Sequence, residues 1–222
     1  MPQFKPLHED DHILAISKPR GILTVGNKPG QKNLLDEVKK DYIKKNIRLR
    51  PLNRLDRDTS GIVLFAKTKE CYEEAVEKKK FGSTTKTYIA LIKGIPQRKS
   101  GAITFPLPSR QDQRKMLPAT TKYRIIETYS FRGGAASIAE IEISSGRFHQ
   151  IRRHFSMIHH PLLMDREYMT KQDYKYFSKI LPFWHYFLHA EKIRMDHFVT
   201  GQPLTITSPL TREFKRAVAA FT

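Results

Sequence analysis

The feature that most constrains this chain is a charged loop that runs directly into an apolar segment. Residues 53–61 read Asn-Arg-Leu-Asp-Arg-Asp-Thr-Ser-Gly, and residues 62–66 read Ile-Val-Leu-Phe-Ala. A short apolar run of this length is typical of a buried strand. Asp56 is therefore expected at the mouth of a structured core, between Arg54 and Arg57. The neighbouring cations favour its ionised form while burial opposes it, so Asp56 is a candidate reactive carboxylate.

From the residues alone, other interpretations of this loop stay open. The loop could be an ordinary turn with solvated charges before a strand. Asp56 and Asp58 could form a metal site, but a hard cation requires several oxygen ligands, and few other acidic clusters in the chain supply them. The two aspartates could be the acid and base of a glycosidase. Their spacing argues against this, because residues two apart in an extended chain are not held across a substrate from each other.

The overall charge indicates a polyanionic partner. The 222 residues include 40 Lys and Arg against 22 Asp and Glu, which gives a net charge of +18. The positive charge is spread along the chain and is not gathered in one amphipathic basic helix. This distribution favours a nucleic-acid-binding surface over attachment to a membrane. A basic protein that is merely soluble is the alternative.

Length and composition exclude several classes of protein. A chain of 222 residues is expected to form one domain or a compact pair of subdomains. No apolar stretch approaches the roughly 20 residues that a membrane-spanning helix needs, and the N-terminus lacks an apolar signal segment. The single cysteine, Cys71, excludes an internal disulfide and a cysteine-based metal cluster. These features are typical of a cytoplasmic protein.

The pattern of apolar residues predicts a mixture of strands and helices. Strands are indicated where apolar residues run together or alternate, and helices where they recur at helical spacing. The strands and helices do not alternate regularly, so the fold class is predicted to be α+β. The predicted strands are residues 12–17, 62–66, 87–93, 137–144 and 204–207, and the predicted helices are residues 34–42, 69–80, 148–158 and 212–220.

Two parts of this pattern carry further predictions. In the helix at residues 69–80, the spacing points Tyr72 and Val76 inward, and the lysines at 78–80 suit the negative end of the helix dipole. Residues 97–118 are predicted to form a long basic connector, and such a loop inside a compact domain is usually functional or disordered. We expect its cations to contact phosphate groups, which supply affinity but little sequence information.

A second charged constellation covers residues 146–154, Gly-Arg-Phe-His-Gln-Ile-Arg-Arg-His, where a strand is predicted to end and a helix to begin. A helix N-terminus binds anions, and Arg147 together with the exposed helix face brings guanidinium and imidazole groups close to it. An ordinary basic amphipathic helix is the alternative. A zinc site is not favoured, because the histidines lack i,i+4 pairing on one face and have no thiolate support.

Taken together, these segments resemble the RluA family of pseudouridine synthases. Residues 54–61 resemble the family's catalytic R-L-D-x-x-T-S-G, and residues 146–154 resemble its G-R-x-H-Q-[IL]-R-x-H. The pieces occur in the family's order and cover nearly the whole chain, which makes the combination far more specific than any one piece. The opening strand with its K-P-x-G turn, the K-x-Y strand, the H-P-[IL] run with its aspartate and two closing pieces match at residues 10–21, 86–88, 160–165, 188–190 and 208–210.

Two positions depart from the family pattern. The family usually has His before R-L-D, where this chain has Asn53, and commonly has Gly before the aspartate of the H-P run, where this chain has Met164. Neither change replaces the carboxylate. The S4-like RNA-binding module of many relatives is not expected, since the chain reaches the first family strand by residue 12. Residues 1–222 are therefore expected to form a single catalytic domain.

The resemblance implies an isomerase that converts specific uridines in structured RNA to pseudouridine, without a cofactor or a metal. It implies the pseudouridine synthase fold, a mixed and mainly antiparallel sheet flanked by helices and loops around a central RNA-binding cleft. The partner would be transfer RNA or large-subunit ribosomal RNA, and the enzyme would be a monomer. The alternative is a catalytically silent RNA-binding or RNA-chaperone protein on the same fold. Retention of Asp56, Tyr88 and Arg152 argues against that alternative.

The resemblance also implies a role for each matched residue. Asp56 would be the essential carboxylate, acting as a nucleophile or as a base on the sugar. Tyr88 would stack on the uracil and assist the later proton removal, and Arg152 would pair with Asp56. Arg54 would fill the space that the flipped base leaves, and Leu188 would pack beside the base. The other residues expected to bind the substrate are Lys86, Arg147 and His149.

Overall fold

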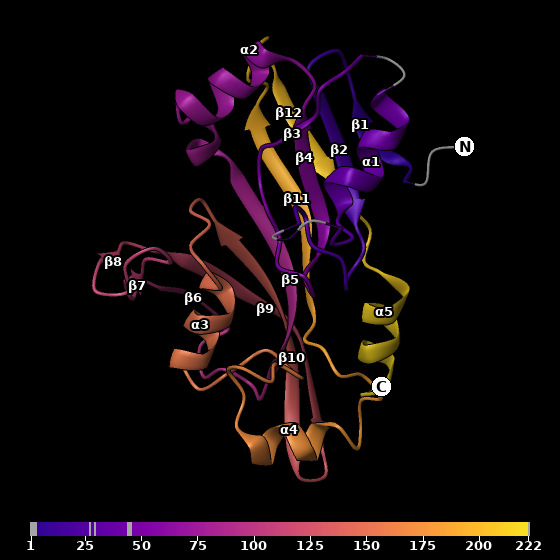
Figure 1. Cartoon of the computed structure of the whole chain (residues 1–222). Helices are drawn as coiled ribbons and strands as arrows, with labels where there is room; N and C mark the ends of the chain where they lie inside the picture. The colour runs from indigo at the N-terminus through magenta and orange to yellow at the C-terminus, as the bar shows by residue number, and fades with distance from the viewer. Residues whose placement is uncertain (1–3, 27, 29, 44–45, 222) are drawn as a thin grey trace. The chain divides into compact units, whose positions relative to one another are not determined.

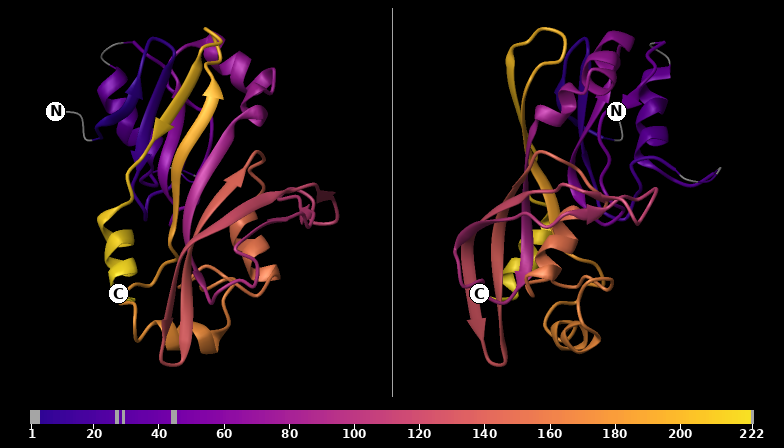
Figure 2. Two further views of the ribbon diagram at one scale, coloured as in Figure 1. Left: turned by 180° about the vertical axis from the view of Figure 1, so that it is seen from behind. Right: turned by 90° about the vertical axis from the view of Figure 1, so that its left-hand side faces the viewer.

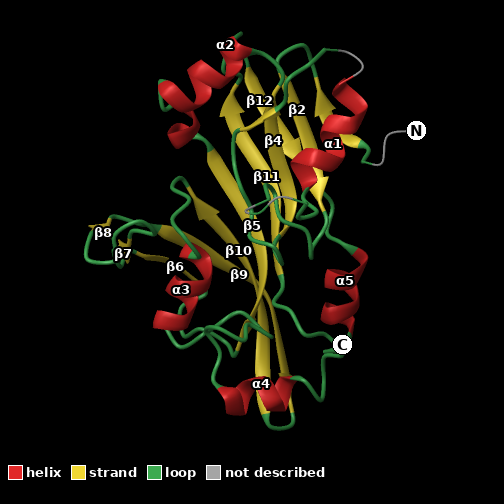
Figure 3. Cartoon of the chain, in the orientation of Figure 1, coloured by secondary structure: helices red, strands yellow, loops and turns green. Residues whose placement is uncertain are grey.

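The computed structural model describes residues 4–26, 28, 30–43 and 46–221, and it divides into two compact units (Figure 1). The first unit contains the described residues up to Lys86 together with Ala190–Pro209. The second contains Thr87–His189 and the described residues from Leu210 onward. In both units more residues lie in strands than in helices, and the helices are short (Figure 3).

The first unit is built on a mainly antiparallel sheet in which β4 (Ser60–Ala66) is a central strand. The strand order is β1-β2-β4-β11, with β3 also on β4 and β12 on β11. All seven residues of β4 are buried, as expected for an apolar run covered on both faces. The other strands are β1 (Pro6–Glu9), β2 (Ile13–Lys18), β3 (Arg50–Pro51), β11 (Leu188–Asp196) and β12 (Pro203–Thr207).

The helices of the first unit follow the predicted positions, but one presents a different face. In α1 (Leu34–Ile43) the expected side chains of Leu34, Val38 and Tyr42 are buried. The predicted helix at residues 69–80 is instead a short helix followed by two other turns, and its expected inward residue Val76 is 38% exposed. The segments are α2 (Lys69–Tyr72), a π-helical turn (Glu73–Glu77) and a 3₁₀ turn (Lys80–Ser83).

The π-helical turn explains why the prediction for Val76 was wrong. Lys78 N donates to Glu73 O, five residues earlier, so the side chains are rotated relative to α-helical spacing. Cys71 and Ala75 face the core in its place, and Tyr72 is only partly buried against the same cluster.

The second unit is a sheet in the order β5-β10-β9-β6, with three helices around it. The β9–β10 hairpin is its longest feature, and its strands stay paired along almost their full length (Figure 2). Phe187 packs edge-on against Phe214 in the core, with 5.7 Å between ring centroids. The elements are β5 (Thr85–Lys93), β6 (Ser100–Ile103), β7 (Leu107–Pro108), β8 (Met116–Leu117), β9 (Thr121–Phe131), β10 (Gly134–Ile143), α3 (Gln150–Met157), α4 (Lys171–Phe177) and α5 (Arg212–Ala219).

The α+β class with a mainly antiparallel sheet is confirmed. The predicted strands are present as β2, β4, β5, β10 and β12, and three predicted helices as α1, α3 and α5. The connector at residues 97–118 is not one long loop, because it contains β6 and the small β7–β8 hairpin. None of the helices in the described part of the chain is both long enough and apolar enough to cross a bilayer.

Candidate active site

The loop that carries Asp56 is fastened to its surroundings on the N-terminal side by Leu55. The Leu55 N–H donates to Thr24 Oγ1 at 3.0 Å, and the same hydroxyl donates to Leu55 O at 3.1 Å. Thr24 and Leu55 are both buried. Because water does not reach them, the Leu55 N–H and C=O groups are satisfied by the Thr24 hydroxyl. Thr59 N donates to Asp56 O at 3.2 Å and closes the turn that follows.

On the C-terminal side the loop is held by Arg57. Gly21 N donates to Arg57 O at 2.8 Å, and Arg57 Nε donates back to Gly21 O at 3.1 Å. Lys18 Nζ adds a third bond, to Arg57 O at 3.1 Å. Because both neighbours of Asp56 are tied to the segment 18–24, the backbone that carries the carboxylate is preorganised.

Lys18 is a fully buried cation beside this loop. Its ammonium donates to Pro19 O at 3.0 Å, to Ile22 O at 2.8 Å and to Arg57 O. Burial lowers its pKa to about 7, and the carboxylates of Asp58 and Asp56 act in the opposite direction. The three bonds explain why a lysine opens the K-P-x-G turn, since three carbonyl groups match its three donors.

Asn53, at the position where the family usually has His, binds the backbone of β4 through its side chain. Its side-chain amide donates to Ile62 O at 3.1 Å, and its Oδ1 accepts from Leu64 N at 2.8 Å. Leu52 N also donates to Leu64 O at 2.8 Å. The Asn53 amide thus extends the pairing of β3 with β4 up to the start of the Asp56 loop.

Gly61 explains the last position of the T-S-G motif. Its φ of 110° lies in the region that favours glycine. A Cβ atom at this position would lie 2.2 Å from the backbone oxygen of Ala190 on β11. Any side chain here would separate β4 from β11, so the close approach of these two strands requires glycine.

Replacing Thr24 tests how much the Asp56 loop depends on this fastening. Thr24→Val keeps the shape but leaves Leu55 N–H and C=O without their partner, at a cost of about 1–3 kcal/mol for each buried group. We expect lower stability in urea unfolding and a slower single-turnover rate with RNA substrate, because small displacements of a reacting group are costly. Thr24→Ser, which keeps the hydroxyl, should stay near wild type in both. Equal behaviour of the Val and Ser variants would contradict this account.

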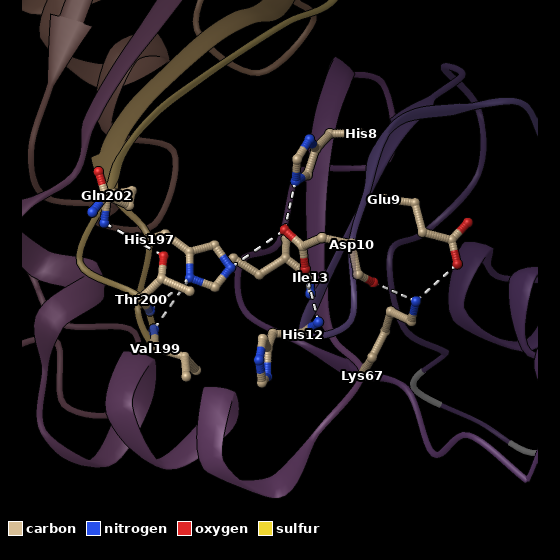
Figure 4. A network of polar contacts seen from close by, with 10 residues as sticks. All are labelled: His8, Glu9, Asp10, His12, Ile13, Lys67, His197, Val199, Thr200 and Gln202. Atoms are coloured by element: carbon tan, nitrogen blue, oxygen red, sulfur yellow. Dashed lines mark hydrogen bonds and ion pairs between the residues drawn. The ribbon is translucent and has the colours of Figure 1, made fainter.

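The opening segment of the family pattern is organised by Asp10 (Figure 4). Its Oδ1 accepts from His12 N and Ile13 N, each at 2.7 Å, and its Oδ2 lies 2.7 Å from His8 Nε2 and 3.3 Å from His197 Nε2. Burial raises the pKa of Asp10, but the bonds from His8 and the two N–H groups outweigh it and hold that pKa below its usual value. Asp10 therefore ties the start of β2 to the β11–β12 hairpin.

Figure 4 also shows how that network is completed on either side. His197 Nδ1 accepts from Val199 N at 3.3 Å and from Thr200 N at 3.1 Å, so its proton lies on Nε2, toward the carboxylate. Lys67 Nζ donates to Glu9 Oε1 at 2.9 Å and to Asp10 O. Within the described part of the chain, no group of three His, Cys, Asp or Glu side chains is arranged to hold a metal ion.

In the second unit, Arg152 on α3 is buried among acidic and aromatic side chains. Its Nε and Nη2 bind the two oxygens of Asp165 at 2.7 and 2.8 Å, and Nη2 also donates to Glu167 at 2.9 Å. The guanidinium lies 4.8 Å from the ring centroid of Tyr168 and 4.4 Å from that of Tyr186. These contacts fix its orientation strongly.

Sequence reasoning did not identify this cage around Arg152. Asp165 was part of the matched H-P run, but no partner was assigned to it. The residue before it, Met164, is buried and has a φ of 66°, a left-handed conformation that glycine adopts most easily. This backbone explains why glycine is common there in the family. Met164 instead fills part of the core of the second unit.

The turn that leads into α3, residues 146–150, is held by the side chain of Gln150. Gln150 Oε1 accepts from Ser145 Oγ at 2.9 Å and from Arg147 N at 3.1 Å, and its amide donates to Thr120 O at 3.0 Å. Arg147 is exposed, with its Nε donating to Pro118 O at 3.3 Å. His149 Nδ1 lies 3.0 Å from Tyr168 Oη, so this imidazole is part of a network within the second unit.

The remaining predicted site residues differ in exposure. Arg54 is exposed, whereas Tyr88 on β5 and Leu188 at the start of β11 are buried. Lys86 is also buried; its Nζ lies 4.7 Å from the Phe81 ring centroid, and burial lowers its pKa to about 8. Asp56, Arg54 and Lys86 belong to the first unit, and the second unit holds the other five, Tyr88, Arg147, His149, Arg152 and Leu188.

Comparison with known proteins shows a similarity to RNA pseudouridine synthases. The family model described as RNA pseudouridylate synthase matches residues 12–157, which include the Asp56 loop and all of α3. The RNA pseudouridine synthase YhcT of Bacillus subtilis is 31% identical over 94% of this chain and 69% of that protein. The dual-specificity RNA pseudouridine synthase RluA of Escherichia coli is 28% identical over 94% of each chain.

Solved structures show the same fold. The structure of human RNA Pseudouridylate Synthase Domain Containing 4 superposes with a TM-score of 0.76 at 21% identity. The superposition covers 97% of this chain and 92% of the human one. The human RNA Pseudouridylate Synthase Domain Containing 1 gives a TM-score of 0.75 at 18% identity, over 97% of this chain and 88% of that one. At this level of identity the likeness shows the fold alone.

Proposed function

The chain belongs to the RNA pseudouridylate synthase family, isomerases that convert uridine to pseudouridine in RNA, and we propose that Asp56 is the carboxylate with which it performs this reaction. The observation that carries the proposal is the fastening of Leu55 and Arg57, on either side of Asp56, to the segment 18–24. A group that must act on one sugar within a large RNA needs such a fixed backbone, because its effectiveness depends on position.

The reaction is an isomerisation, so its atoms balance within the substrate. The bond from C1′ of the ribose to N1 of uracil breaks, the base turns, and C5 forms the new bond to C1′. C5 then loses its proton, and N1 gains one. The target base must leave the stack for Asp56 to reach the sugar. The exposed Arg54, two residues before Asp56, would fill the vacated position in the RNA helix.

We assign Arg152 to the orientation of Asp56. In the second unit, Arg152 is held by Asp165 and Glu167 through its Nε and Nη2 atoms. A guanidinium that is already oriented by other carboxylates can position Asp56 with little further ordering. Lys86, Arg147 and His149 would contact the RNA, and Leu188 would pack beside the base.

We further propose that the substrate is transfer RNA or large-subunit ribosomal RNA. The similar proteins include RluA, named as a dual-specificity RNA pseudouridine synthase, and the ribosomal large subunit pseudouridine synthase C of Pasteurella multocida, 30% identical over 96% of this chain and 67% of that protein. The net charge of +18 suits either RNA. In this proposal residues 1–222 act as one catalytic domain, as a monomer, in the cytoplasm.

The proposed function is tested by mapping pseudouridine in total RNA from cells with and without the gene. We expect one or a few uridines to lose the modification when the gene is deleted, and to regain it when the wild-type gene returns. A gene carrying the Asp56→Asn change should not restore it. Identical maps in all strains would contradict the proposal.

A separate prediction concerns the hydroxyl of Tyr88. Tyr88→Phe should bind RNA like wild type, since the ring can still stack, but should react at least about tenfold more slowly, because proton transfer by a positioned group contributes about 10²–10⁴-fold. The control is Tyr129→Phe, which removes the hydroxyl of a buried tyrosine on β9 and should leave the rate unchanged. Single-turnover kinetics and binding are measured for both. An unaltered rate in Tyr88→Phe would leave Tyr88 only a stacking role.

A further inference from the structure

Phe148 is a large apolar side chain at a turn where the family pattern sets no fixed residue. It is the x of G-R-x-H, lies immediately before His149 and α3, and is 37% exposed. A single exposed phenylalanine is ordinary on a protein surface. What distinguishes Phe148 is the set of side chains around its ring.

Two arginines from different elements converge on this ring. Arg110, in the loop between β7 and β8, has its guanidinium carbon 5.2 Å from the Phe148 ring centroid. Arg153, on α3, lies 6.0 Å from the same centroid. Its neighbour Arg152 is buried against Asp165, whereas Arg153 is only half-buried. The two adjacent arginines of α3 therefore have different surroundings: Arg152 contacts Asp165, and Arg153 lies over the Phe148 ring.

The ring of Phe148 is also held by a stacking contact with the neighbouring histidine. It stacks on the imidazole of His149, with 3.7 Å between centroids and 23° between planes. His149 is itself held, because its Nδ1 lies 3.0 Å from Tyr168 Oη and 3.4 Å from Glu167 Oε1. A ligand that stacks on Phe148 thus meets a ring that is already oriented, and little further ordering is needed.

The aromatic ring of Phe148 and the guanidinium groups of Arg110 and Arg153 together match the groups of a nucleotide. An aromatic face offers stacking to any base, and guanidinium groups offer both stacking and charge-assisted bonds to phosphate. An acidic protein segment would use the arginines but not the aromatic face. An unpaired nucleotide uses both, because its flat base and its phosphate are separated by only one sugar.

We propose that Phe148, Arg110 and Arg153 form a stacking site for an unpaired nucleotide of the substrate RNA, distinct from the uridine that is isomerised. The inference rests on the proposed function in taking RNA as the substrate. Its consequence is selective: an RNA in which a second unpaired base can reach this site binds more tightly than one in which that base is paired. The site contributes affinity and choice of RNA and takes no part in the bond changes.

The test compares Phe148→Ala, Phe148→Leu and Phe148→Tyr with wild type. The probes are an RNA hairpin with a uridine-containing single-stranded loop and a fully paired duplex of the same stem. Base–aromatic stacking is worth about 1–3 kcal/mol, so we expect Ala and Leu to weaken hairpin binding by about 5- to 150-fold and Tyr to restore it. Binding of the duplex should be unchanged. Phe105→Ala, at another exposed phenylalanine of the second unit (53% exposed), is the matched control and should bind normally.

Arg110→Gln separates the charge from the stacking. It should flatten the dependence of log K on log salt by about 0.7 for the one lost phosphate contact, whereas Phe148→Ala should leave that slope unchanged. Wild-type hairpin affinity in Phe148→Ala would overturn the inference, as would an equal loss for hairpin and duplex.

The two proposals fail in different ways. Hairpin binding that depends on Phe148, in a protein that forms no pseudouridine, would refute the proposed activity and leave the stacking site standing. Normal activity at saturating RNA with no effect of Phe148 on affinity would refute only the stacking site. In all variants the single-turnover rate at saturating RNA is expected to equal that of wild type, because Phe148 lies outside the proposed chemistry.

Discussion

Asp56→Asn is expected to reduce pseudouridine formation by at least about 10³-fold while RNA binding stays within a few-fold of wild type. The side chain keeps its size, so the loop held by Leu55 and Arg57 should keep its shape. The variant lacks the carboxylate that is proposed to act on the sugar as a nucleophile or as a base. The measurements are the single-turnover rate with RNA substrate and the dissociation constant for the same RNA.

Asp58→Asn is the matched control for this prediction. It removes an equal charge from the same loop two residues away, and we expect it to lower the rate less than tenfold. A metal site made by Asp56 and Asp58 would instead lose activity similarly in both variants, and adding Mg²⁺ or Mn²⁺ would partly restore it. Equal losses with rescue by metal would replace the proposed role of Asp56 by a metal-based one.

Arg152→Lys is expected to have the second-largest effect, a loss of at least about 100-fold in single-turnover rate together with lower stability. An ammonium cannot reproduce the fork that binds both oxygens of Asp165, and so cannot also fulfil the role proposed for Arg152 toward Asp56. Disrupting a buried ion pair by removing one partner typically costs about 3–5 kcal/mol, and a Lys replacement should cost a fraction of that. The rate is therefore measured at a temperature where unfolding curves show the variant to be fully folded.

Two further variants separate orientation from folding. Arg153→Lys should keep the rate at saturating RNA and weaken RNA binding, since Arg153 lies beside Phe148 and not in the Asp165 cage. Asp165→Asn should lower stability and also slow the reaction, because it releases the guanidinium that we propose to orient Asp56. If Arg153→Lys lost more chemistry than Arg152→Lys, the wrong arginine would have been assigned.

The sequence predicted the elements whose hydrophobic pattern is local. The run at residues 62–66 became the buried strand β4, and the spacing of Leu34, Val38 and Tyr42 became the inner face of α1. The K-P-x-G turn and the T-S-G glycine also lie where the motifs indicated. These features depend on interactions between residues close in sequence, or on backbone geometry that one residue type satisfies.

The rest depended on contacts that no local pattern contains. β9 went unpredicted because its register shifts opposite Ile138 and Ala139, which interrupts the alternation, and Ile126 is exposed. The face of the helix after Lys69 was mispredicted because a π-helical turn replaces α-helical spacing there. Arg152 is held by Asp165 and Glu167, 13 and 15 positions further along the chain, so no helical periodicity could pair them.

Asn53 shows what the motif alone could not decide. Because Asn53 replaces the usual His, the sequence does not indicate whether the Asp56 loop keeps its shape. In the structure the amide bonds Ile62 O and Leu64 N, so the substitution is accommodated by extending the pairing with β4. The candidate site is thus recognisable from sequence, whereas the means by which it is held in place required the structure.

The central claim is that this chain isomerises uridine in RNA through Asp56. Formation of the C5–C1′ bond expels the hydrogen at C5, so the most direct measurement is tritium release from transfer RNA and ribosomal RNA that carry 5-tritiated uridine, prepared from cells lacking the gene. The account predicts release by the purified wild-type protein and background release by Asp56→Asn. Absence of release from both RNAs by folded wild-type protein, or equal release by the two proteins, would contradict it.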